Sequence, residues 1–147
     1  MKLLDVNVVL AAHREDHPQF AIARPWLTAL LASRVPYAVI DAVAVAFLRL
    51  ATNRRVFTIP TPDMNAFSYL AALRAQPGHV LVAPGPEHLA VLQTVCEDAD
   101  ASGDLIVGAQ LAALAVEHAC ELVSFDRDFA RFPNLRWTRP TVPSPGA

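Results

Sequence analysis

Three aspartates stand where short apolar runs end, and their positions predict metal chemistry. Asp5 follows the run at 3–4, whereas Asp126 follows the run at 121–125 and Asp128 lies two residues further on. Carboxylates that converge on one rim repel each other unless a cation or a proton lies between them. Mg²⁺ is held by one or two carboxylates, with water and substrate phosphate at its other positions. Such an ion activates water and stabilises charge on a phosphodiester, so the pattern indicates metal-assisted phosphoryl chemistry.

Asp5 taken alone allows other interpretations. An aspartate after a first strand also occurs in phosphate-transfer receiver domains and in dehalogenase-like phosphatases, and the same residue type often caps a helix. The second carboxylate, Asp126, favours a shared metal site, because both are expected at one edge of a sheet.

The elements that would position these carboxylates follow from alternating apolar and helical patterns. Strands are expected at 2–5, 37–40, 79–83, 121–125 and 135–137. Helical patterns are expected at about 7–12, from Arg24 and Pro25 onward, at 41–53, from Asp63, from 84–86 to about Cys96, and at 104–119. This alternation predicts an α/β fold with a mostly parallel central sheet of four to five strands flanked by helices.

The expected helix starts rest on capping residues. Asn7, Asp41 and Asp63 are of types that accept hydrogen bonds from the first turn, and Pro25 is of the type found near a first turn. Phe67, Leu70 and Leu73 share one side of the helix that begins at Asp63. Residues 1–138 are interpreted as one domain, and residues 139–147 as an extended or disordered tail, because prolines and a glycine dominate that stretch.

Composition narrows the class of protein. Apolar residues make up 54% of the 147 residues and charged residues 18%, which excludes a disordered chain and predicts buried helices or a face covered by a partner. We therefore expect a homodimer with a mainly apolar interface. The net charge of -2 gives no global basic field for nucleic acid, although Lys2 is the only lysine and arginine suits phosphate contacts.

The sequence contains no pattern typical of a signal peptide, a membrane span or a cysteine metal site. The opening segment places Asp5 inside its apolar run and lacks a cleavage site, and no apolar stretch is long enough to span a bilayer. A cytoplasmic protein without membrane contact is expected. Cys96 and Cys120 lie far apart and fit no metal-ligand spacing, so they are interpreted as small buried hydrophobic residues.

Four segments resemble the PIN-domain ribonucleases that form the VapC toxins of VapBC toxin–antitoxin pairs. They are LLDVNVVLAA at 3–12, FLRLATNRRVF at 47–57, LAALAVEH at 111–118 and SFDRDFARFPNLRW at 124–137. They occur in the order of the family and extend over nearly the whole chain. Individually each segment is modest, and together they are specific.

The resemblance implies a magnesium-dependent endoribonuclease, with Mn²⁺ as an alternative ion, that cleaves structured RNA such as tRNA or rRNA loops. It also implies a homodimer and a VapB-like antitoxin whose C-terminal segment lies across the active-site groove. By this resemblance Asp5 is the first metal ligand, Asp126 is the last acidic position, Asp128 is an auxiliary carboxylate, and Arg49 matches an arginine of the second segment.

Two positions depart from the pattern of the family. An acid is usual on the helix ahead of the PheLeuArg run, where this chain has Ala44, and Asp41 lies one turn earlier on the same helix face. An aspartate is also usual directly before the run at 109–113, where this chain has Gly108. Asp104, one turn before Gly108, is either a helix cap or a replacement metal ligand.

Arginines outside the acidic set are candidates for RNA contacts. Arg49, Arg54 and Arg127 are the expected RNA-binding residues, and Arg55 and Arg131 extend the same rim. A solvated surface is the alternative interpretation for all of them. The five histidines show no metal-ligand spacing.

Two functional hypotheses follow. The first is an active metal-dependent endoribonuclease toxin. The second is a catalytically degenerate PIN-like module that binds an antitoxin or RNA without cleaving. Asp5 and Asp126 favour the first hypothesis, and the residues at 44 and 108 favour the second.

Overall fold

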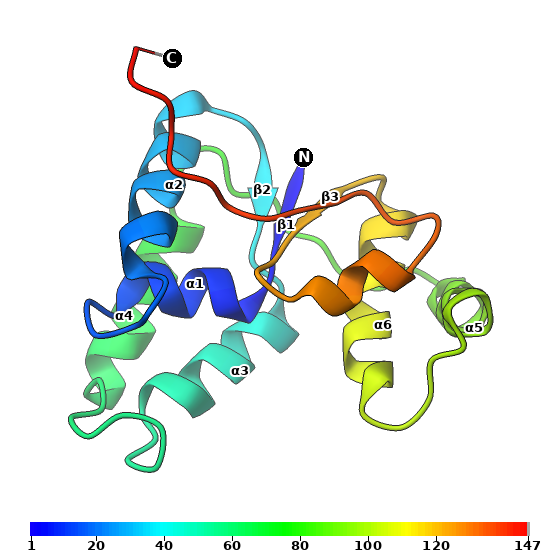
Figure 1. Cartoon of the computed structure of the whole chain (residues 1–147), viewed down its shortest axis with the longest axis horizontal. Helices are drawn as coiled ribbons and strands as arrows, with labels where there is room; N and C mark the ends of the chain where they lie inside the picture. Colours follow the sequence, from blue (N-terminus) through cyan, green and yellow to red (C-terminus); the bar gives the residue numbers. More distant parts are fainter. Residues whose placement is uncertain (147) are drawn as a thin grey trace.

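A four-stranded parallel sheet forms the centre of the protein, as the computed structural model of residues 1–146 shows (Figure 1). The order of the strands is β2-β1-β3-β4, so β1 and β3 lie side by side in the middle. Leu3 of β1 is opposite Ala38 of β2 on one side and Leu122 of β3 on the other. The predicted α/β class and parallel sheet are confirmed; the strands are β1 (Lys2–Leu4), β2 (Tyr37–Ala38), β3 (Glu121–Val123) and β4 (Trp137–Thr138).

Helices cover both sides of this sheet. In Figure 1 the helices α1, α2 and α4 lie on one side and α5 and α6 on the other, with α3 crossing below. The bounds are α1 (Val6–His13), α2 (Phe20–Ser33), α3 (Asp41–Ala51), α4 (Asp63–Arg74), α5 (His88–Ala99) and α6 (Leu105–Glu117), with a short 3-10 helix, η1, at Arg127–Arg131.

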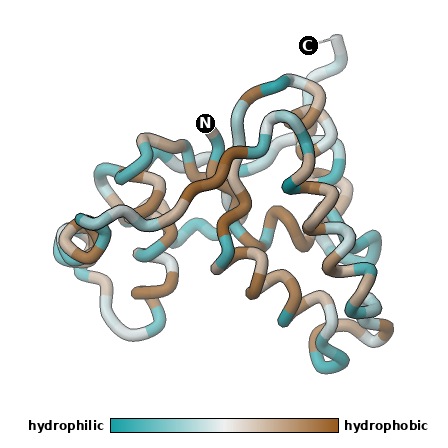
Figure 2. Tube along the Cα trace, turned by 180° about the vertical axis from the view of Figure 1, so that it is seen from behind, coloured by the Kyte–Doolittle hydropathy of each residue, from teal (hydrophilic) through white to brown (hydrophobic). Residues whose placement is uncertain are grey.

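The core lies where the sheet meets α1 and α6. Leu3, Leu4, Leu122 and Val123 are fully buried, because the two central strands are covered on both faces. The trace coloured by hydropathy accordingly shows apolar segments concentrated through the middle of the molecule (Figure 2). Helix α6 presents the buried run 111–115 to this core, which fixes the position of its first turn beside the strand ends.

One predicted strand is wrong. The segment 79–83 makes a single bridge, between His79 and Tyr37, in which the N–H of Val80 donates to the carbonyl of Tyr37 (2.8 Å). Beyond this bridge Leu81 is 86% exposed, and among the described residues the segment forms no further bridge. Pro84 also lacks the N–H that a continued ladder needs. The strand predicted at 135–137 is present but lies later in the sequence, as β4 at Trp137–Thr138.

Four predictions about helix starts are also corrected. Asp41 and Asp63 are the first residues of α3 and α4 rather than their caps, which are Ile40 and Pro62. Asp5, rather than Asn7, caps α1, because the carboxylate of Asp5 accepts the N–H of Val6 (2.7 Å). Helix α2 begins at Phe20, so Pro25 lies inside it and not at its first turn. On α4, Leu70 and Leu73 are buried as expected, but Phe67 is exposed. Within residues 1–146 no helix is long and apolar enough to cross a membrane.

Candidate active site

The two predicted aspartates meet at the carboxyl edge of the sheet. Asp5 directly follows β1, and Asp126 follows β3 after two further residues. The backbone N–H of Asp5 donates to the carbonyl of Val123 (3.0 Å), which continues the pairing of the two strands up to the site. Both aspartates line a cavity of about 340 Å³ together with Asp104 and Gly108, here called the site groove.

Asp5 is held by three hydrogen bonds. The N–H of Val6 donates to its Oδ1 (2.7 Å), while the hydroxyl of Ser124 (2.7 Å) and the Nδ2 of Asn7 (3.2 Å) donate to its Oδ2. Ser124 is fully buried, so its hydroxyl has a fixed position. The carboxylate of Asp5 is therefore set in one orientation before any ligand binds.

Ser124 and Asn7 extend this network to the second strand. The N–H of Asp126 donates to the Ser124 Oγ (3.0 Å), and the Asn7 Nδ2 donates to the same oxygen (2.9 Å). The N–H of Phe125 donates to the Asn7 Oδ1 (3.1 Å). Sequence reasoning missed both residues as parts of the site. The signal was their spacing, since each lies two residues from an aspartate at a strand end.

The electrostatics of Asp5 favour a bound cation. Burial raises the pKa of the Asp5 carboxyl above its ordinary value, and the nearby charge of Asp126 raises it further, whereas the hydrogen bonds from Ser124 and Val6 lower it. A partly buried carboxylate with another carboxylate nearby is stabilised by positive charge placed between them.

Asp126 and Asp128 have different surroundings. Asp126 is exposed, and its Oδ1 accepts the N–H of Asp128 (2.9 Å), so it caps η1 while its carboxylate faces the groove. Asp128 lines a neighbouring cavity of about 220 Å³ with Asp126, Asp104 and Gly108. It is near the site groove but is not among the residues that line it.

Helix α6 forms the opposite wall. Asp104 directly precedes α6 but makes no side-chain hydrogen bond to its first turn, so it does not act as a helix cap. Its carboxylate lines both cavities. A Cβ added at Gly108 would lie 3.6 Å from the ring of Phe129, which is ordinary van der Waals contact. The backbone at position 108 therefore accommodates a Cβ without a clash.

Helix α3 brings only apolar side chains to the groove. Ala42, Val43 and Ala46 line it, whereas Ala44 is not among the lining residues and packs against the core. Asp41 is directed elsewhere: it is 95% exposed and pairs with Arg74 (2.9 Å). The suggestion that Asp41 replaces a missing acid is therefore wrong.

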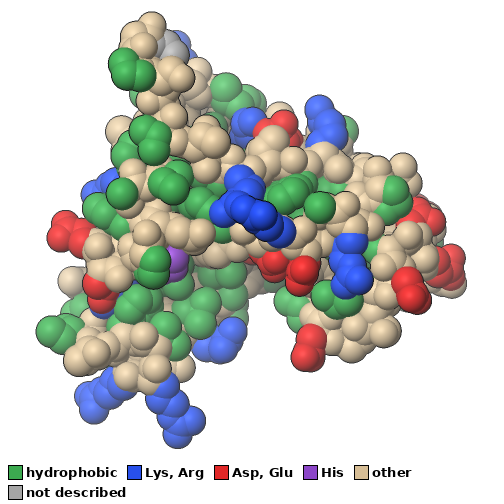
Figure 3. All heavy atoms as spheres, viewed as in Figure 1, with side chains coloured by type: hydrophobic (Ala, Val, Ile, Leu, Met, Phe, Trp, Pro, Cys, Tyr) green, Lys and Arg blue, Asp and Glu red, His purple; other side chains and the backbone are tan. Residues whose placement is uncertain are grey.

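The predicted RNA-binding arginines lie around the site and not in it. Arg49 is in the last turn of α3, Arg54 is in the turn that follows, and Arg127 is the first residue of η1; all three are exposed and none lines the groove. Basic side chains project from separate points on the face shown in Figure 3 and form no single basic stripe there.

The residues fit a hydrated divalent ion better than a closed metal cage. Within residues 1–146, no three His, Cys, Asp or Glu side chains form a cluster able to hold a metal ion. Asp5 and Asp126 nevertheless provide carboxylate oxygens, and one or two carboxylates are sufficient for Mg²⁺ that keeps most of its water. Asp104, on the facing wall, adds a further negative charge.

A parallel sheet whose strand ends bring carboxylates to one groove is typical of small α/β metallonuclease domains. Comparison with known proteins identifies the family. A sequence profile of the PIN domain matches residues 2–135. The chain is 54% identical to ribonuclease VapC25 and 56% identical to ribonuclease VapC31, both of Mycobacterium tuberculosis; each match covers 97% of this chain and 100% of the relative.

A solved structure has the same fold. The structure of VapBC2 from Rickettsia felis, bound to a DNA fragment from their promoter, gives a TM-score of 0.68 at 18% identity, covering 95% of this chain and 98% of that chain. The chain thus belongs to the PIN-domain family, among the VapC proteins. Ribonucleases with a PIN domain generally depend on a divalent metal ion.

Proposed function

We propose that the chain is the toxin of a type II toxin–antitoxin pair and acts as a metal-dependent endoribonuclease. One observation carries the proposal. Asp5 and Asp126 lie at the ends of adjacent strands in one groove, in a chain more than half identical to relatives named ribonucleases. The same groove has carboxylates on two of its sides, so a phosphodiester of RNA could bind in it next to the metal ion.

In this proposal Asp5 and Asp126 hold the metal ion, and Asp104 contributes through water. The chemistry that a divalent ion supplies there, when bound, is stabilisation of charge on the scissile phosphodiester and easier deprotonation of water. Ser124 and Asn7 orient the Asp5 carboxylate by donating to its Oδ2. The apolar side chains of α3 and α6 that line the groove limit the access of bulk water and so strengthen these interactions.

The finer assignments are part of the same proposal. Mg²⁺ is the resident ion and Mn²⁺ can replace it, because the donors are carboxylate oxygens. The substrate is structured RNA such as tRNA or rRNA, contacted by Arg49, Arg54 and Arg127. Residues 1–138 form the catalytic domain and 139–147 an extended tail, and the protein works in the cytoplasm.

The proposed partners are a VapB-like antitoxin and a second copy of this chain. The antitoxin follows from the VapC relatives, and its C-terminal segment would cover the site groove. The homodimer follows from apolar side chains left exposed on α3 and α6, among them Val45 (65%) and Val107 (76%). Light scattering that detects only monomer at high micromolar concentration would contradict the homodimer.

A second candidate function is a module that binds RNA or antitoxin without cleaving. The observation in its favour is that Gly108 and Ala46 bring no acid to the groove. A cation site with fewer carboxylates binds its ion more weakly, so this candidate predicts binding with little turnover.

The test is incubation of the purified chain with total RNA, with Mg²⁺, with Mn²⁺ or with a chelator. We expect weak cleavage that needs the added ion, and none from an Asp5→Ala protein. A parallel Gly108→Asp protein should cleave more strongly. Absence of cleavage by both the parent and Gly108→Asp would contradict the endoribonuclease proposal and leave the binding module.

A further inference from the structure

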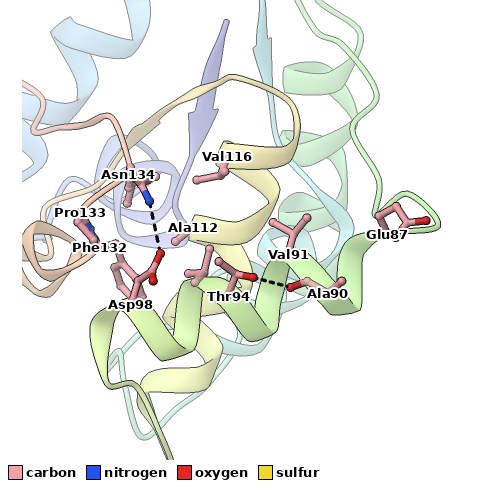
Figure 4. Close-up of a pocket in the computed structure, with 12 residues that line it drawn as sticks. Glu87, Ala90, Val91, Thr94, Asp98, Ala112, Val116, Phe132, Pro133 and Asn134 are labelled. Carbon is pink, nitrogen blue, oxygen red and sulfur yellow. Dashed lines mark hydrogen bonds between the residues drawn. The ribbon is translucent and has the colours of Figure 1, made fainter.

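A second cavity is lined by residues of α6 other than those that line the site groove. It occupies about 400 Å³ between α5, α6 and the loop 132–135 (Figure 4), and is here called the α5 cavity. A volume of this size is within the range of small-molecule sites, about 300–1,000 Å³. The VapC relationship and the proposed reaction leave this cavity without a role.

The cavity exists because the side chains between α5 and α6 are too small to fill the space between the two helices. Of the twelve residues of α5, only Val95 is fully buried, and the other apolar side chains that pack against the core, Val91, Leu92, Cys96 and Ala99, are only partly buried. On α6 the facing residues are Ala112 and Val116, and Ala112 is too small to fill the space between the helices. Pro133 stiffens the loop that closes the third side.

The chemistry of the lining defines a class of ligand. Val91, Val95, Val116 and Phe132 give the cavity apolar walls suited to an aliphatic or aromatic body. The charged residues that line it are Glu87 and Asp98, and no lysine or arginine is among the lining residues. Figure 4 shows these two carboxylates at opposite ends of α5. An anionic ligand is disfavoured there, and a cationic one is favoured.

Asp98 is the better placed of the two acids. Its Oδ2 accepts a long hydrogen bond from the Asn134 Nδ2 (3.4 Å), which joins α5 to the loop across the mouth of the cavity. Glu87 lies eleven residues earlier, about 16 Å along the helix axis at 1.5 Å per residue. A compact ligand that occupies the apolar part next to Phe132 therefore places its charge at Asp98.

Phe132 connects this cavity to the carboxylates. It lines the α5 cavity and also the small cavity that contains Asp104, Gly108 and Asp126. Its ring lies 6.1 Å, between centroids, from the ring of Phe129, which in turn packs beside Gly108. Both rings belong to, or directly follow, η1, the helix that Asp126 caps. A ligand that displaces the Phe132 ring therefore pushes on the element that positions Asp126.

We propose that the α5 cavity binds a small ligand with an aromatic body and a cationic end, and that this binding is coupled to the site groove through Phe132 and Phe129. The binding part stands independently of the proposed ribonuclease function. The coupling rests on that function only for its biological meaning. It can be measured without RNA cleavage, as a change in ion affinity at Asp5 and Asp126 when the ligand binds.

The probe for binding is 1-naphthylmethylamine, with 1-naphthylacetic acid as the matched anion. Titration into the ¹⁵N-labelled full chain should shift the amide resonances of residues 91–98 and 132–135 in a saturable way. The Asp98→Asn protein should bind the amine about twofold to fivefold more weakly, as expected for a solvent-exposed ion pair. Equal binding of the amine and the acid, or shifts spread over unrelated surfaces, would overturn the proposal.

Two variants separate the cavity from the rest of α5. Thr94 is exposed and lines the cavity, so Thr94→Trp should fill it and remove saturable binding. Gln93, the preceding residue, is exposed and does not line the cavity, so Gln93→Trp should leave binding unchanged. Amine binding that weakens as protein concentration rises would overturn the proposal, since a second copy would then be the occupant.

Coupling is tested by reciprocity. If the amine changes the affinity for Mn²⁺ by some factor, Mn²⁺ must change the affinity for the amine by the same factor. We expect a measurable factor, with shifts at the amides of Gly108 and Asp126, and its loss in Thr94→Trp. No change in either affinity would overturn the coupling. A chain that cleaves no RNA but still binds the amine would disprove the proposed function and leave the cavity assignment standing.

Discussion

The two walls of the site groove differ in how firmly they are built. The strand wall, formed by Asp5, Asn7, Ser124 and Asp126, is a continuous hydrogen-bond network around a fully buried serine. The α6 wall contains Asp104, which makes no capping bond to its helix, and Gly108, which has no side chain.

This difference shows where the site can lose an acid without losing the fold. On the strand wall the same bonds orient a carboxylate and join β1, β3 and α1, so a substitution there affects stability as well as chemistry. On the α6 wall a glycine costs about 1 kcal/mol of helix propensity and disrupts no bond of the network. A missing acid at 108 is therefore compatible with an intact domain.

Restoring an acid on the α6 wall should give the largest change. Gly108→Asp adds a carboxylate at a position where a Cβ meets only ordinary contacts. At an effective dielectric near 20, an added charge is worth roughly 1–4 kcal/mol, so Mn²⁺ binding should tighten by about fivefold to several hundredfold. Titration calorimetry measures this change, and RNA cleavage should rise with it.

The control for that substitution is Gly108→Asn, which has nearly the same size and no charge. It should fill the same space and leave Mn²⁺ affinity within about threefold of the parent, because the gain is electrostatic. A gain from Asn as large as that from Asp would show that shape, and not charge, is what the α6 wall lacks.

Removing the centre of the strand wall should affect stability next most strongly. Ser124→Ala deletes the hydroxyl that bonds Asp5, Asn7 and Asp126. The N–H of Asp126 then loses its acceptor, and the Asn7 Nδ2 keeps only its bond to Asp5. The expected loss is about 1–3 kcal/mol in the free energy of unfolding, measured with urea. Ser102→Ala, at an exposed loop position, should change it by less than about 0.5 kcal/mol. Equal losses of unfolding free energy in the two variants would mean that the hydrogen-bond network around Ser124 does not stabilise the fold.

The proton affinity of Asp5 gives a smaller, pH-dependent effect. The pKa of Asp5 is raised in the folded state, chiefly by burial, so the folded protein binds this proton more tightly than the unfolded chain. The parent protein is therefore stabilised as the pH falls through the raised pKa of the folded state and then through the ordinary pKa of the unfolded chain. Above both pKa values this contribution to stability is absent. Asp5→Asn cannot titrate.

In chelator, the stability of the parent relative to Asp5→Asn should therefore increase as the pH falls from 7 towards 4. Urea unfolding of the two proteins in parallel checks the direction, and the other titrating groups cancel in the difference. A relative stability that does not depend on pH would show that Asp5 has an ordinary pKa, and that the strand wall imposes no electrostatic cost in the absence of an ion.

Sequence reasoning located the strand wall better than the α6 and α3 walls. Asp5 and Asp126 could be predicted because a carboxylate after a buried parallel strand has one edge at which to lie. Asn7 and Ser124 were missed, since polar residues near strand ends resemble ordinary caps. Ala44 was chosen, but Ala42, Val43 and Ala46 line the groove, because the rotation of α3 about its axis depends on packing that helical spacing does not give.

The fold shows a similar division between what pattern determines and what context determines. The apolar runs of β1 and β3 are buried on both faces, and they were predicted as strands. The run at 79–83 has the same composition, but it makes one bridge to β2 and then leaves the sheet. Composition alone could not distinguish these cases, because the presence of a covering layer decides between them.

The smallest expected effects distinguish the two carboxylates that remain exposed near the α6 wall. In the Gly108→Asp protein, Asp104→Asn should weaken Mn²⁺ binding by about twofold to fivefold, because Asp104 lines the site groove and acts through water. Asp128→Asn should weaken it by less than about twofold. Asp128 lines only the neighbouring cavity, and its contact with Asp126 uses its backbone N–H, which asparagine retains. If Asp128→Asn is instead the more damaging of the two, η1 rather than α6 supplies the third charge, and the α6 wall is a steric boundary with no electrostatic part in the site.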